Sequence, residues 1–71
     1  MEQRRFKVIL YLLGDDGKPL SSTEAARIFK VNPRTIRRYK AGDRKIPPLL
    51  AEKAERLAQI AARGRDWRRH A

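Results

Sequence analysis

The stretch SSTEAARIFKVNPRTIRRYKAG, residues 21–42, carries the strongest structural signals in this chain. Ser21 is followed three residues later by Glu24, the spacing of a capping box, in which a hydroxyl and a carboxylate each accept an unpaired backbone N–H at a helix start. Asn32 is a second N-cap residue, and Pro33 follows it at the first helical position, where its missing N–H costs nothing. These signals predict two short helices separated by only a few residues.

The first of these helices should run from Ser21 to about Phe29. Its expected buried positions are Ala25, Ala26, Ile28 and Phe29. The second should end with Lys40 and Ala41 in its last turn and Gly42 as the glycine that follows it.

The second helix has an unusual distribution of side chains. On a helical wheel of about 100° per residue, Ile36 and Tyr39 share one side. The opposite side carries Arg34, Arg37, Arg38 and Ala41. An ordinary surface helix has a wider apolar stripe and mixes charges of both signs. This helix is therefore predicted to be anchored by two residues and to present a block of guanidinium groups to something anionic.

Two further helices are expected on either side of this stretch. Apolar residues at i, i+3, i+4 and i+7 spacing predict a helix within residues 2–13 that ends at Gly14; they are Phe6, Ile9, Leu10 and Leu13. The alternative is a strand, because the segment FKVILYLL is short. A helix is also expected from the pair Pro47–Pro48 up to Gly64, where the repeating positions are Leu50, Ala54, Leu57 and Ala61. Within it, Glu52 and Arg56 have the spacing of an i, i+4 ion pair.

Some apolar residues exceed what this core needs. Val8, Tyr11 and Leu12 lie on the other side of the first helix, where a dimer partner or the C-terminal segment could cover them. Leu49 and Ile60 likewise widen the stripe of the last helix. The sequence therefore predicts an all-α domain of four short helices over residues 1–64, followed by a mobile basic tail over residues 65–71. Trp67 in that tail is either a packing residue or part of a partner surface.

Charge is concentrated rather than spread. The chain carries a formal net charge of +10, and residues 27–45 hold eight basic residues against Asp43 alone. Residues 63–69 add four arginines against Asp66, and the rest of the chain is balanced. Such a local excess is the electrostatic footprint of a protein that binds a polyanion.

Composition excludes several classes of function. A chain of 71 residues has room for one modest core but not for an enclosed substrate cavity. It has no cysteine and one histidine, so neither disulfides nor a Cys/His zinc site is expected, and no catalytic set of nucleophile and base can be assembled. The longest apolar run is too short to span a membrane, and no signal peptide is evident. We expect a cytoplasmic protein that is not an enzyme and needs no cofactor, metal or small-molecule substrate.

Residues 21–42 resemble the helix-turn-helix of the Cro/repressor-like (XRE-type) regulators of phages and bacteria, and RTIRRYKAGDRKIPP extends the likeness to Pro48. In that family a small residue packs the first helix against the second, apolar residues flank the turn, and two apolar positions lock the recognition helix. These positions are matched here by Ala26, Phe29, Val31, Ile36 and Tyr39. The chain departs from the family at Lys30, where a glycine is common, and in its long connection between the first two helices.

The resemblance implies a lambda-repressor-like DNA-binding domain that inserts the helix after Asn32 into the major groove. Residues in or beside the groove would be Asn32, Arg34, Thr35, Arg37 and Arg38. Ser22 and Thr23 would contact phosphate at the start of the supporting helix, and Arg44 and Lys45 would do so from the following loop. Arg27 and Lys30 are expected to add backbone contacts.

The function expected is therefore a sequence-specific transcriptional regulator of double-stranded DNA. Such regulators often repress their own operon in phage, plasmid or anti-CRISPR-associated settings, which implies repression. One small reader makes few base contacts, so a homodimer on an inverted repeat is expected. Two alternatives remain: a non-specific architectural DNA- or RNA-binding protein, and the DNA-binding subunit of a toxin–antitoxin or recombination complex.

Overall fold

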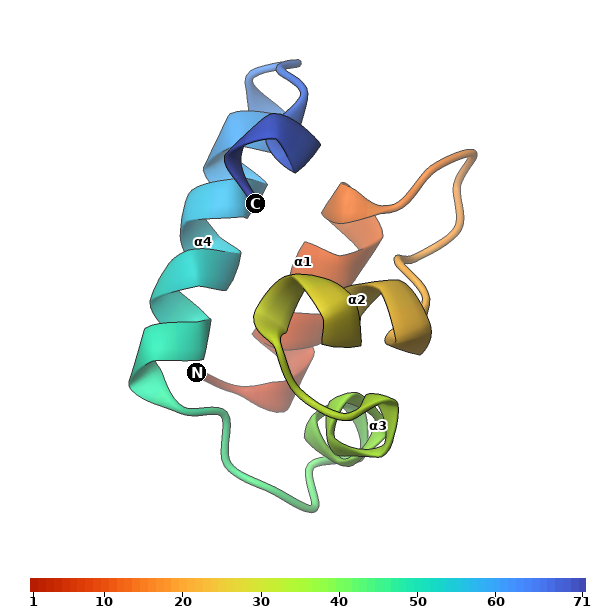
Figure 1. Ribbon diagram of the computed structural model, residues 1–71, viewed down its shortest axis with the longest axis vertical. Helices are drawn as coiled ribbons and strands as arrows, with labels where there is room; N and C mark the ends of the chain where they lie inside the picture. Colours follow the sequence, from red (N-terminus) through yellow and green to blue (C-terminus); the bar gives the residue numbers. More distant parts are fainter.

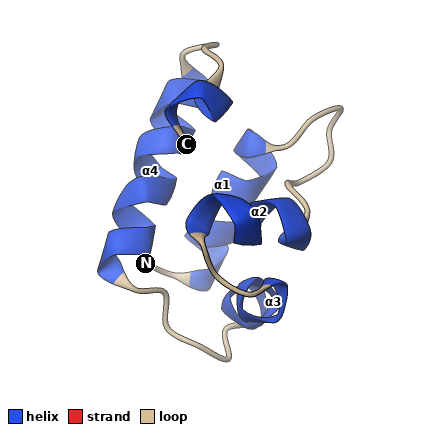
Figure 2. Cartoon of the chain, viewed as in Figure 1, coloured by secondary structure: helices blue, strands red, loops and turns tan.

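The computed structural model describes residues 1–71 and contains helices and loops only (Figures 1 and 2). In chain order they are α1 (Gln3–Leu13), α2 (Ser22–Phe29), α3 (Pro33–Ala41), α4 (Pro48–Ala62) and a short 3₁₀ helix, η1 (Trp67–His70). The expected all-α class with four short helices is confirmed. The alternative of a strand in the first segment is wrong, because its apolar residues follow the helical period.

The predicted helix ends are present, with one difference. The Ser21 hydroxyl accepts a hydrogen bond from the Glu24 backbone N–H at 3.1 Å, and Asn32 Oδ1 accepts one from the Arg34 N–H at 2.8 Å. Gly42 ends α3 in the left-handed conformation, with φ of 81°. Only half of the expected capping box forms, since the Glu24 carboxylate binds the Arg68 guanidinium instead of returning to the start of α2.

The core forms around α1, which packs against both α3 and α4. Its residues Phe6, Ile9, Leu10 and Leu13 are all buried, as expected. The Phe6 ring lies 6.3 Å from that of Phe29 on α2 and meets the Tyr39 ring of α3 edge-on at 5.8 Å between centroids. One aromatic residue of α1 therefore links the α2–α3 pair to the rest of the fold.

The C-terminal segment differs from the prediction of a mobile tail. Asp66 caps η1 by accepting the Arg68 backbone N–H at 3.1 Å, and η1 packs against α4. Trp67 is only 5% exposed, so it packs within its own chain, from η1 and not from α4. A single turn has too few residues to show a period in the sequence. The burial of one large side chain holds it in place nonetheless.

Not every apolar residue is covered. Val8, Tyr11 and Leu12 are 48%, 57% and 44% exposed on the outer side of α1, so the C-terminal segment does not cover that face. Leu49, at the start of α4, is 80% exposed. None of the helices has both the length and the apolar character needed to cross a bilayer.

Candidate nucleic-acid interface

A three-residue turn sets the relation between α2 and α3. Lys30 adopts the left-handed conformation, with φ of 57° and ψ of 46°, and its N–H donates to the Ala26 carbonyl. The Val31 N–H donates to that same carbonyl at 3.0 Å. Figure 1 shows α2 lying across the view while α3 is seen nearly end-on, so the two helices cross at a large angle. A lysine adopts this conformation at a cost of about 1 kcal/mol. Lys30 therefore takes the place of the glycine that is common at this position of the family.

α3 is held by its inner side and by its C-terminal end. Ile36 is fully buried and Tyr39 is 4% exposed, as the helical wheel predicts. The Gln3 side-chain amide of α1 also donates to the Lys40 carbonyl at 2.6 Å, which satisfies an end of α3 that has no helical partner. The glycine after α3 leaves room for this contact, because a Cβ atom at Gly42 would lie 2.5 Å from the Gln3 side-chain oxygen.

The outer side of α3 carries unpaired positive charge. Arg34, Arg37 and Arg38 are all exposed. The ion pairs of the molecule involve Arg5, Arg68 and Arg69 only, so no acid neutralises any basic residue of segment 27–45. Asp43, the one acid of that segment, is itself exposed and unpaired. The guanidinium block is therefore open to an external anion.

The other expected contact residues lie at the ends of the same unit. At the start of α2, Thr23 is exposed and Ser22 half-buried, and neither backbone N–H has a partner in the chain. The Asn32 side-chain oxygen caps α3 by accepting the Arg34 N–H, and its amide NH₂ has no partner in the chain. Thr35 is half-buried beside Ile36.

The loop after α3 is fixed by one buried residue and exposes the basic residues before it. Ile46 is 7% exposed, while Arg44 and Lys45 are exposed. In Figure 1, α3 and this loop form the lower end of the molecule. The structure therefore gathers the predicted residues of α3 and of the loop at one end of the fold.

Two positioning contacts were not evident from the sequence. Gln3 supports the end of α3, and Lys53 of α4 donates to the Ile28 carbonyl at the end of α2 at 2.9 Å. Each is an isolated polar residue on an amphipathic helix. In the sequence, such a residue cannot be distinguished from one that faces solvent. Each contact joins residues at least 25 positions apart, so only the packing of the helices brings them together.

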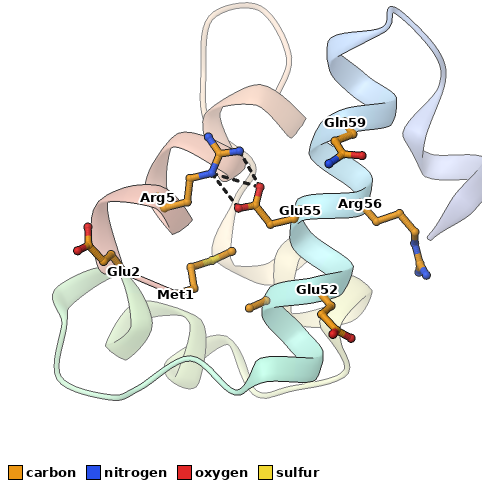
Figure 3. Close-up of a pocket in the computed structure, with 8 residues that line it drawn as sticks. Met1, Glu2, Arg5, Glu52, Glu55, Arg56 and Gln59 are labelled. Atoms are coloured by element: carbon orange, nitrogen blue, oxygen red, sulfur yellow. Dashed lines mark hydrogen bonds and ion pairs between the residues drawn. The ribbon is translucent and has the colours of Figure 1, made fainter.

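The ion pair expected within α4 does not form. Glu52 and Arg56 have no ionic partner; instead Glu55 accepts two hydrogen bonds from Arg5 Nε and one from Nη2, the last at 2.6 Å (Figure 3). The hydrogen bonds from Arg5 hold the pKa of Glu55 below its ordinary value. This pair spans an open depression between α1 and α4, on a surface of mixed charge.

No family model, curated protein or solved structure matches this chain. The geometry and the charges described above are therefore the features of this chain that point to a function.

Proposed function

We propose that this chain is a sequence-specific, DNA-binding transcriptional regulator of the helix-turn-helix class that reads the major groove with α3. The observation that carries the proposal is the set of exposed, unpaired guanidinium groups of Arg34, Arg37 and Arg38 on a helix fastened by its opposite side. The major groove of B-DNA admits an α-helix, and an arginine fork matches the O6 and N7 acceptors of guanine.

The residues of α3, of the start of α2 and of the loop after α3 have different roles in DNA binding. Arg37 and Arg38 read base edges, while Arg34 and Asn32 lie near the start of α3, close to bases or phosphate. The free amides at the start of α2, together with Arg44 and Lys45, bind the phosphate backbone and set the register. The regulator acts as a repressor and binds an inverted repeat as a homodimer, with half-site centres about 34 Å apart.

In the alternative with a protein partner, Trp67 and the basic tail contact that partner; Trp67 is buried within the chain, whereas the arginines of the tail are exposed. A non-specific architectural protein would use the same charge without base readout. It would not need a helix that turns three arginines to one side while its two apolar residues point inward. The geometry therefore favours base readout.

Selection of bound duplexes from a random DNA library tests the proposal. A specific regulator enriches one motif, and a dimer enriches a palindrome whose half-sites lie one helical turn apart. Recovery of unselected sequences at every round would reject specificity and support the architectural alternative. Preferential recovery of single-stranded RNA from a mixed pool would reject DNA as the ligand.

A further inference from the structure

Four residues form a stripe on the outer side of α4; three of them have no partner in the chain, and the fourth, Ile60, packs in part against the core. Leu49, Glu52, Arg56 and Ile60 fall within about 80° of one another on a helix of about 100° per residue. Leu49 is 80% exposed, Ile60 is half-buried, and neither Glu52 nor Arg56 forms an ion pair. In Figure 3 the Glu52 and Arg56 side chains project from α4 with no interaction drawn to either.

The stripe is symmetric about its own middle. The midpoint between Leu49 and Ile60 lies within one residue of the midpoint between Glu52 and Arg56, near Ala54. A second α4 that runs antiparallel across this point therefore sets each Leu49 against the partner's Ile60. The same placement sets each Glu52 against the partner's Arg56. A two-fold contact requires this kind of self-complementary surface.

Charge favours α4 over the other apolar surface, on α1. Two copies at +10 each repel, so contact is opposed least where the local charge is balanced. On α1, Arg4 and Lys7 are unpaired and there is no acid, so contact through Val8 and Leu12 would bring two positively charged helices together. On α4, Glu55 is already paired with Arg5 and Lys53 is turned toward the end of α2, so the stripe carries one acid, Glu52, and one base, Arg56.

We infer that the chain self-associates through an antiparallel α4–α4 contact, in which two Glu52–Arg56 ion pairs between copies lie between two Leu49–Ile60 contacts. The inference deepens the proposed function, which requires a dimer, by naming the surface. Each surface ion pair contributes little alone, so the dimer is weak in the absence of DNA. DNA with two half-sites then favours it by raising the local concentration of the two copies.

Charge reversal tests the contact without DNA. E52R and R56E change exposed residues of α4, and circular dichroism checks that each variant is folded. Sedimentation equilibrium of the wild type, over micromolar to millimolar concentrations, should show a mass that rises from 8.3 kDa toward twice that value. Each variant places like charges opposite one another, so its dissociation constant should rise at least about tenfold.

Two further measurements restore the contact. An equimolar mixture of E52R and R56E sets two basic groups of one chain against two acidic groups of the other, and should form a heterodimer. The double variant E52R/R56E should recover self-association. Leu12→Ser is the matched control on α1 and should leave the mass distribution of the wild type unchanged.

The inference is overturned if the wild type remains at 8.3 kDa throughout, or if the single variants associate as the wild type does. It is also overturned if Leu12→Ser alone abolishes association, which would assign the contact to α1. None of these measurements involves DNA. The α4 contact and the DNA-binding function can therefore fail independently.

Discussion

Arginine has opposite surroundings in two regions of this molecule. Arg68 on η1 donates to both Glu24 and Asp15, at 3.2 and 3.0 Å, and Arg5 on α1 forms a bidentate pair with Glu55. Arg37 and Arg38 on α3 form no ion pair. The difference teaches that every ion pair between elements of the fold uses Arg5 or Arg68. The arginines of α3 form no ion pair.

The paired region should matter most for stability. Trp67→Ala removes a buried indole against which the Arg68 guanidinium stacks at 4.6 Å, and should lower the free energy of unfolding by about 3 kcal/mol. Urea denaturation followed by circular dichroism measures this loss. Tyr11→Ala, at a side chain that is 57% exposed, is the control and should change stability by less than about 0.5 kcal/mol. Equal effects of the two variants would mean that the C-terminal segment is detached in solution.

The unpaired region should matter for DNA and not for folding. Arg37→Ala should weaken binding to the selected site by about 1–3 kcal/mol and relax preference at particular base pairs, because it removes a base contact. Lys45→Ala should weaken all sequences alike and lower the slope of log affinity against log salt by about 1, because it removes one phosphate contact. Fluorescence anisotropy on cognate and scrambled duplexes measures both. If both variants lose the same affinity for the cognate and the scrambled duplex, the assignment of Arg37 to base readout is wrong.

Replacing one arginine in each region by glutamine isolates the effect of ion pairing on stability. Arg68→Gln should destabilise the fold by about 0.5 kcal/mol, since its ion pairs with Asp15 and Glu24 are exposed to solvent. Arg38→Gln should not lower the free energy of unfolding, because it removes an unpaired charge from a chain of net charge +10. Thermal unfolding at low and high salt checks this, since only the effect of Arg68→Gln should shrink as salt screens its pairs. A larger loss for Arg38→Gln would reverse the comparison.

The smallest expected effect is a dependence on acid. Hydrogen bonds from Arg5 lower the pKa of Glu55 in the folded chain. The pair therefore stabilises the fold at pH values above 4.5, the ordinary pKa of a glutamate. That contribution should be lost as pH falls through the lowered pKa. Glu55→Gln should therefore melt slightly below the wild type at neutral pH, and the two should converge in acid. A difference that grows as pH falls would contradict the sign of the shift.

Much of the candidate site was predictable because its determinants are local. The caps Ser21 and Asn32, the proline at the start of α3 and the glycine at its end act within a few residues of each other, and the helical period alone separates Ile36 and Tyr39 from the arginines. Glu24 shows where such reasoning fails. Its spacing predicts a return bond to the start of α2, but an arginine 44 residues away takes its carboxylate.

The sequence by itself determined the four α-helices and the side of α3 that carries positive charge, since periodicity, capping and charge are properties of neighbouring residues. Only the tertiary structure decided which charges are neutralised. The links Arg5–Glu55, Arg68–Glu24 and Gln3–Lys40 join positions 37 to 50 residues apart. They exist because packing around α1 brings distant segments together. The burial of Trp67 has the same origin, because the surface that covers it forms only when α4 and the C-terminal turn meet.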